Sequence, residues 1–145
     1  IQQADGKLVL AGITAQIFSN SDIALARFNA DGTLDSTFGD SGRTTLHLGG
    51  NDGVRGFIQQ PDCKLVMAGN TTAGGSYQQV LARFNADGTL DGSFGTGCTT
   101  FVNLGPASGA NGIAQQPDGK LVTIGVAFGT AAGHIGIARV NKNEL

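Results

Sequence analysis

The sequence predicts an all-β fold built from a tandem repeat, and three observations support this. Residues 25–35, LARFNADGTLD, return letter for letter at residues 81–91, so the chain must be interpreted as repeating units. Glycine makes up 24 of the 145 residues, more than double the average of about 7 per cent, without the three-residue period of collagen. Asp outnumbers Glu, whose only representative is Glu144, and Asp favours turns where Glu favours helices.

A hairpin motif occurs three times, at residues 2–12, 59–69 and 115–125. The copies read QQADGKLVLAG, QQPDCKLVMAG and QQPDGKLVTIG. Pro-Asp-Gly suits a type I turn followed by a left-handed residue, so each copy predicts a strand, a tight turn and a second strand. We name these strands A and B. Strand B is apolar at consecutive positions, as expected for a sheet that is covered on both faces.

Strand C is expected at residues 23–28, 79–84 and 135–140, each with Ala-Arg at the same place. After the identical loop, residues 44–48 and 99–104 alternate like a strand D. Each unit of about 56 residues therefore predicts four short antiparallel strands, which is typical of a β-propeller blade. A β-solenoid is the alternative, but hairpin turns imply antiparallel strands and argue against it.

The repeat divides the chain into blades at residues 1–50, 51–105 and 106–145, within one repeat domain. The first blade lacks most of strand A, and the third stops before strand D. Three blades do not close a ring, and an open stack exposes apolar faces and strand edges. We expect a homo-oligomer, with six blades from a dimer as the simplest ring. The alternative is a piece of a longer repeat array.

Two motifs, NADGTLDxxFG and QQxDGKLV, resemble the bacterial delta-60 repeat, and the resemblance extends over essentially the whole chain. It implies a propeller-type fold and a secreted or cell-surface bacterial protein. It implies no activity and no catalytic residues. The chain departs from the pattern where Cys63 and Cys98 replace turn glycines, and where the third copy decays at residues 141–145.

Composition excludes several partners and cofactors. The net charge is −2 with no basic cluster, so a nucleic-acid backbone has nothing to bind. No apolar run approaches the roughly 20 residues of a membrane span.

The chain opens on Ile1 without a signal peptide. We expect no metal and no cofactor, because the repeated aspartates lack the closing Glu of a calcium loop and the Cys and His residues lack zinc spacing.

Side chains shared between units are expected to be structural. An arginine in each strand C would tie its blade to a nearby aspartate or carbonyl, and a phenylalanine in the loop would fill the space between blades. An anion-binding ring of arginines is the alternative. The structural set comprises Arg27, Arg83, Arg139, Asp35, Asp91, Phe38 and Phe94.

The two cysteines lie in one blade, in its A–B turn and its C–D loop. An antiparallel order places both of these connections at the same end, so Cys63 and Cys98 are candidates for a disulfide in an exported protein. Two unrelated thiols are the alternative, because loop lengths do not fix their separation.

Unshared polar residues gather on the opposite end, where the B–C connections and D–A links vary. Variable loops on a fixed scaffold are where binding sites usually lie, although solvated loop residues have the same appearance. The candidate ligand-binding residues are Asp22, Asp52, Arg55, Tyr77 and His134, with His47 in the adjacent strand.

Two function classes follow from this pattern. The favoured one is a binding or structural module that recognises a glycan, a peptide or a surface polymer through the variable-loop face. The alternative is an esterase-like hydrolase or a lyase, with its site on that face or at the ring axis. His134 or His47 would act as base beside Asp52 or Asp22, with Arg55 as an electrostatic partner. A protease built on Ser41 is disfavoured, since neither histidine has a matching context.

Overall fold

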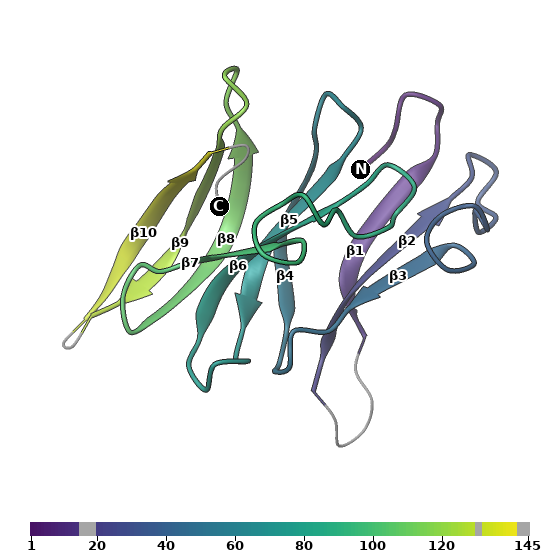
Figure 1. Cartoon of the computed structure of the whole chain (residues 1–145). Coiled ribbons are helices and arrows are strands. Elements are labelled where there is room, and N and C mark those ends of the chain that lie inside the picture. The colour runs from purple at the N-terminus through teal and green to yellow at the C-terminus, as the bar shows by residue number, and fades with distance from the viewer. Residues whose placement is uncertain (15–19, 130–131, 142–145) are drawn as a thin grey trace.

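The computed structural model describes residues 1–14, 20–129 and 132–141. These residues form ten strands and no helix, which confirms the all-β prediction. The strands make three antiparallel sheets that stand side by side (Figure 1). No helix that could cross a membrane occurs in the described part of the chain.

Each sheet falls within one repeating unit, and its strands follow chain order. The first sheet contains β1 (Leu8–Thr14), β2 (Asp22–Phe28) and β3 (Arg43–Leu46). The second contains β4 (Gly53–Gln59), β5 (Leu65–Thr71), β6 (Gln78–Phe84) and β7 (Thr99–Val102). The third contains β8 (Ala107–Gln115), β9 (Leu121–Phe128) and β10 (Gly133–Val140).

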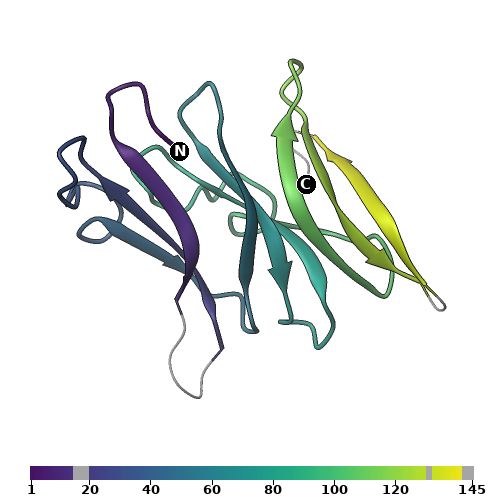
Figure 2. The ribbon, with the colours of Figure 1, turned by 180° about the vertical axis from the view of Figure 1, so that it is seen from behind.

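The prediction of three four-stranded blades needs correction, because only the second sheet has four strands among the described residues. The second unit supplies strands A to D as β4 to β7. In the first unit, strand A is reduced to a bridge between Gln2 and Leu8 and to bonds between Ile1 and Val9. The third sheet ends at β10. The three sheets do not form a closed ring in this structure (Figure 2).

The predicted hairpin turns are present in all three units. The amide of the second glutamine donates to the lysine carbonyl four residues later, as in Gln60 to Lys64 at 2.8 Å. The turn requires a left-handed residue, supplied by Gly6 (φ 84°) and Gly119 (φ 86°). Cys63 takes the same conformation with φ 66°, although a residue with a Cβ adopts it at some cost.

Two hydrophobic clusters hold the sheets together, one on each side of β5. Leu65 and Met67 belong to the cluster shared with the first sheet, whereas Val66 and Ala68 belong to the cluster shared with the third. Every residue of β5 is buried, the polar Asn70 and Thr71 at its end included. Full burial of a side chain such as leucine contributes about 1.5–3 kcal/mol, so the second unit is stabilised from both neighbours.

The A strands β4 and β8 take part in the contacts between sheets. Strand β4 contacts β1 and β8, and β8 also lies against β5 and β6. The A–B turns and the C–D loops lie at one end of the molecule, which we call the turn end (upper end in Figure 1). The B–C connections and D–A links lie at the other, which we call the link end.

Candidate functional site

A lysine, an aspartate and an arginine meet in each of the first two units. In the second unit, Asp91 accepts hydrogen bonds from Arg83 Nε at 2.6 Å and Lys64 Nζ at 2.7 Å. Burial raises the pKa of Asp91, but hydrogen bonds from Lys64, Ser93 and Arg83 outweigh it and hold that pKa well below its usual range. Asp91 is only 5% exposed, so this group ties strand B, strand C and the following loop together.

The first unit repeats this arrangement and connects it to its neighbour. Asp35 accepts from Arg27 at 2.7 Å and from Lys7 at 2.9 Å. Hydrogen bonds from Thr37 and Lys7 hold the pKa of Asp35 well below its usual range. Arg27 also donates to the carbonyl of Ala86 in the second unit at 2.9 Å.

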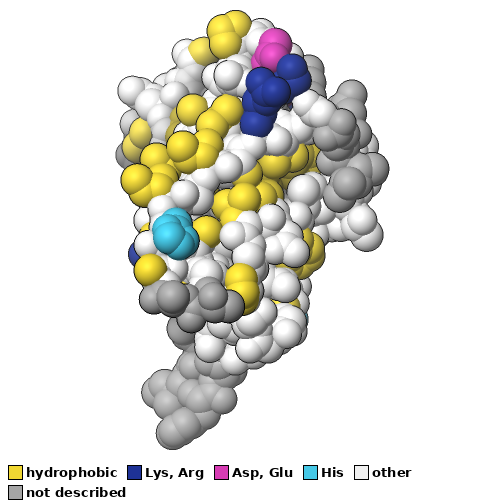
Figure 3. All heavy atoms as spheres, turned by 90° about the vertical axis from the view of Figure 1, so that its left-hand side faces the viewer, with side chains coloured by type: hydrophobic (Ala, Val, Ile, Leu, Met, Phe, Trp, Pro, Cys, Tyr) yellow, Lys and Arg dark blue, Asp and Glu magenta, His cyan; other side chains and the backbone are white. Residues whose placement is uncertain are grey.

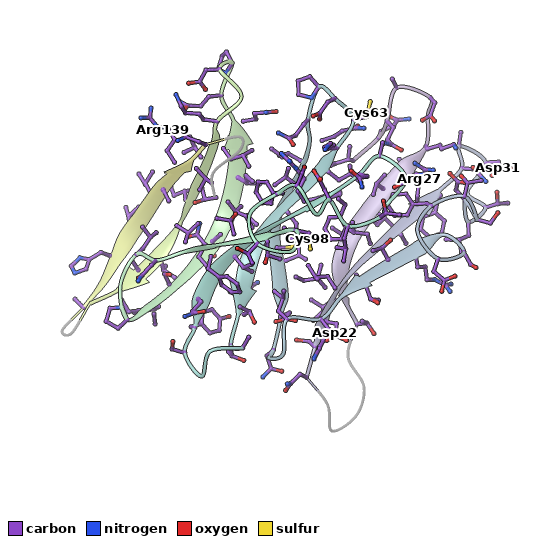
Figure 4. The ribbon with its side chains drawn as sticks, viewed as in Figure 1. Asp22, Arg27, Asp31, Cys63, Cys98 and Arg139 are labelled. Atoms are coloured by element: carbon purple, nitrogen blue, oxygen red, sulfur yellow. The ribbon has the colours of Figure 1, made fainter. Side chains whose placement is uncertain are left out.

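The repeated phenylalanines lie beneath the arginines. The guanidinium of Arg27 is 4.7 Å from the ring centre of Phe38, and that of Arg83 is 4.6 Å from Phe94. Both rings are fully buried. These contacts support a structural role for the repeated side chains. Arg139, labelled in Figure 4, is exposed and makes no hydrogen bond or ion pair within the described ranges.

At the link end, the structure brings together Asp22, His47 and Asp52. These come from the start of β2 and from the link between β3 and β4. His47 Nδ1 lies 2.5 Å from Asp22 Oδ1. The hydrogen bond and charge of Asp22, with a contribution from Asp52, raise the pKa of His47, so the imidazole stays protonated to a higher pH than usual.

Asp52 differs from its two neighbours because it is 2% exposed and fully engaged. Its oxygens accept from the amide of Leu48 at 2.9 Å and from the hydroxyl of Thr71 at 2.5 Å. Asp52 therefore anchors the D–A link to β5. Its nearest ligand atom and those of Asp22 and His47 all lie within 4.8 Å of one another, so this trio is where the described chain could hold a cation.

The remaining predicted ligand-binding residues lie elsewhere, and no hydrogen bond or ion pair in the described part joins them to Asp22 or His47. Arg55 is exposed on β4 at the register shift between Val54 and Gly56. Tyr77 borders the third sheet, where its carbonyl accepts from the amide of Ser108 at 2.8 Å. His134 is exposed on β10.

The disulfide suggested by the sequence is not formed, because both cysteines are free. Cys63 is exposed in its turn, whereas Cys98 is buried in the cluster between the first and second sheets. The two are labelled at separate places in Figure 4. Burial raises the pKa of the Cys98 thiol.

The turn end holds residues that sequence reasoning overlooked. Two hollows lie between successive A–B turns, and Gln60 lines both of them. Both polar atoms of the Gln60 side-chain amide are buried without a hydrogen-bond partner. The side-chain oxygen Oε1 of Gln116 is also buried without one. The glutamines recur in each unit, and recurrence made them look like scaffold; only the packing around each turn distinguishes them.

Comparison with known proteins supports the repeat type. A family model described as "Domain of unknown function (DUF5122) beta-propeller" matches residues 3–38 and 60–94. The two matches run from the A–B turn into the C–D loop of the first and second units. A search of curated proteins finds no match to this chain. Residues 3–38 and 60–94 are therefore similar to repeats of a β-propeller family.

Proposed function

We propose that this chain of β-propeller-type repeats is a binding module of an exported bacterial protein, and that it binds a glycan at the link end. The resemblance to the delta-60 repeat supports export. The observation that supports glycan binding is the pairing of Asp22 with His47 beside the variable connections, with the imidazole exposed and the carboxylate partly so.

The pair suits sugar hydroxyls. A carboxylate such as Asp22 accepts hydrogen bonds from hydroxyl groups, and a protonated imidazole donates them. The corresponding positions of the second unit hold Gln78 and Asn103, so the charged pair occurs in the first unit and not in the second. Asp52 holds the link in place from beneath, which fixes the position of the following strand.

Glycan binding is tested with a printed glycan array, followed by calorimetry with the strongest binder. We expect Asp22→Asn and His47→Ala each to weaken binding about tenfold, the equivalent of one charge-assisted hydrogen bond. Asp40→Asn is the matched control, because Asp40 is exposed in a C–D loop at the opposite end. Unchanged affinity in both site variants would contradict the proposal.

A hydrolase remains the second candidate, because a histidine oriented by an aspartate is half of a catalytic triad. One feature favours binding. No hydroxyl or thiol is hydrogen-bonded to His47 in the described part of the chain. An ester panel with wild type, His47→Ala and His134→Ala separates the two, since turnover abolished by either substitution would establish an enzyme.

We also propose that a second copy of the chain covers the outer face of the third sheet. That face is apolar (Figure 3), and Ile135 and Ile137 on it are 77% and 63% exposed. Ile137 corresponds in the repeat to Leu81, which the second sheet buries against the third. The face therefore has the apolar composition of a sheet face against which another unit packs. A strictly monomeric mass by light scattering would remove this proposal.

A further inference from the structure

The A–B turns of the second and third units enclose a hollow at the turn end of the molecule. Its volume is about 690 Å³, and its lining comes from residues 60–62 and 115–119. A second hollow of about 720 Å³ lies toward the first unit. Gln60 and Gln115 line both. Because β4 and β8, the A strands of the second and third sheets, lie against each other, the first hollow lies where a propeller would have the mouth of its axis.

Gln60 has an unusual environment for a buried amide. It is 3% exposed, yet neither Nε2 nor Oε1 has a hydrogen-bond partner among the described residues. Its backbone amide donates to the Lys64 carbonyl at 2.8 Å, so the turn fixes the residue while its side chain stays unpaired. A buried polar group left unpaired costs about 1–3 kcal/mol. Replacement by an apolar side chain of similar size would avoid this cost.

In the second and third units, the first glutamine of each turn bonds the turn, whereas the second leaves side-chain atoms unpaired. In the third unit, Gln115 Nε2 donates to the carbonyl of Gly119 at 3.1 Å, which closes the turn. The next residue, Gln116, has a buried Oε1 without a partner. Gln115 thus stabilises the turn through its side chain, whereas the unpaired Oε1 of Gln116 lies at the hollow.

We propose that this hollow binds an extended peptide through its main chain, with Gln60 as the central contact and Gln116 as the second. A carboxamide offers donors and an acceptor side by side. One residue of an extended chain presents its N–H and C=O to the same side, as paired strands do. A single carboxamide can therefore pair with both groups, without any requirement on the peptide side chain.

Two further observations favour a neutral extended peptide. One nearby charge is paired, because Asp118 lies 2.7 Å from Lys120 Nζ, and Asp62 accepts a hydrogen bond from the Lys64 amide. In addition, β4 and β8 are edge strands of their sheets, and an edge strand offers unpaired backbone groups to an added segment. The site lies at the opposite end from Asp22 and His47, so it does not depend on the glycan proposal.

The test uses a blocked Ala-Gly-Ala-Gly-Ala peptide and follows the side-chain NH₂ signals of Gln60 and Gln116 in the ¹⁵N-labelled protein. We expect saturable shifts of both signals in the wild type. Gln60→Met keeps the side-chain volume and removes the amide. In this variant, the peptide affinity measured from the Gln116 signal should fall at least about tenfold. The melting temperature should stay equal or rise, because an unpaired amide is lost. This combination distinguishes a ligand contact from a structural one.

Two comparisons complete the test. Gln2→Met is the matched control, because Gln2 is exposed and lines neither hollow, and it should bind the peptide like wild type. Maltopentaose tests a glycan in the same place. Shifts with maltopentaose alone, shifts that persist in Gln60→Met, or no shift with the peptide would each overturn the proposal.

Discussion

The second and third units share the hairpin motif and the Ala-Arg of strand C, yet they differ in how their central strands are buried. Strand β5 is buried at every position, whereas β9 alternates between buried and exposed residues. The difference comes from the surroundings. The second sheet has another sheet packed on each of its faces, whereas within the described residues the third sheet has one on a single face. Apolar residues on both faces of a strand therefore indicate a need for two neighbours and do not guarantee them.

The same comparison applies to charge. Arg83 pairs with Asp91 in a buried site at 2.6 Å, while Arg139 at the equivalent position is exposed and unpaired in the described chain. Lys64 reaches across to Asp91, whereas Lys120 pairs with Asp118 in its own turn. A repeated arginine therefore becomes a structural contact only where the aspartate of a C–D loop lies beside it.

Removal of the strand C arginine should give the largest difference in stability between the second and third units. Arg83→Ala leaves Asp91 buried without its closest partner, and we expect a loss of about 3 kcal/mol in unfolding free energy. This is the low end for a buried pair, because Lys64 still bonds Asp91. Arg139→Ala is the matched control and should change stability by less than about 0.5 kcal/mol. Denaturant titration measures both, and equal losses would contradict the structural interpretation.

Equivalent apolar positions provide a second test. Leu81 is fully buried, and Leu81→Ala should lower the unfolding free energy by about 2–5 kcal/mol through lost burial and a cavity. Ile137→Ala should alter unfolding of the monomer by less than about 0.5 kcal/mol, yet weaken self-association if a second copy covers the third sheet. Chemical unfolding and light scattering across a dilution series measure the two effects. A self-association constant unaffected by Ile137→Ala would exclude that face from the interface.

Acid should affect the first two units before the third. The pKa values of Asp35 and Asp91 lie well below usual in the folded state. Their contribution to stability is therefore complete above the unfolded pKa of about 3.9 and is lost as the pH falls below it. Hydrogen-exchange protection factors in β2 and β6 should decrease between about pH 5 and pH 3 more than those in β9. A uniform decrease would show that these aspartates do not set the acid response.

The hairpins could be predicted from the sequence because their determinants are local. A turn such as the one containing Asp118 and Gly119 needs only a few residues of fixed conformation, and it forms as expected. The incomplete outer sheets were also indicated by the sequence, which holds little of strand A in the first unit and stops before strand D in the third. How the sheets are arranged around one another could not be predicted in the same way. Pairing depends on which edges meet, and in the first unit only Ile1 and Gln2 occupy the strand A position.

The candidate sites were only partly predictable for the same reason. Polar residues in the variable connections marked Asp22, His47 and Asp52, but only their positions in space revealed that Asp52 is an anchor. Repetition suggested that the glutamines were scaffold. Both side-chain polar atoms of Gln60 are buried without a partner, as is Oε1 of Gln116. Such burial depends on the packing around each turn, which the repeat pattern alone does not show.

The left-handed turn at Cys63 has a practical consequence for labelling chemistry. Thiol reagents attack the thiolate, and the buried Cys98 has a raised pKa, so an alkylating dye should react first at the exposed Cys63. That side chain borders the hollow next to Gln60. The natural sequence thus offers a single-site fluorescent reporter at the mouth between the turns, without any engineered residue.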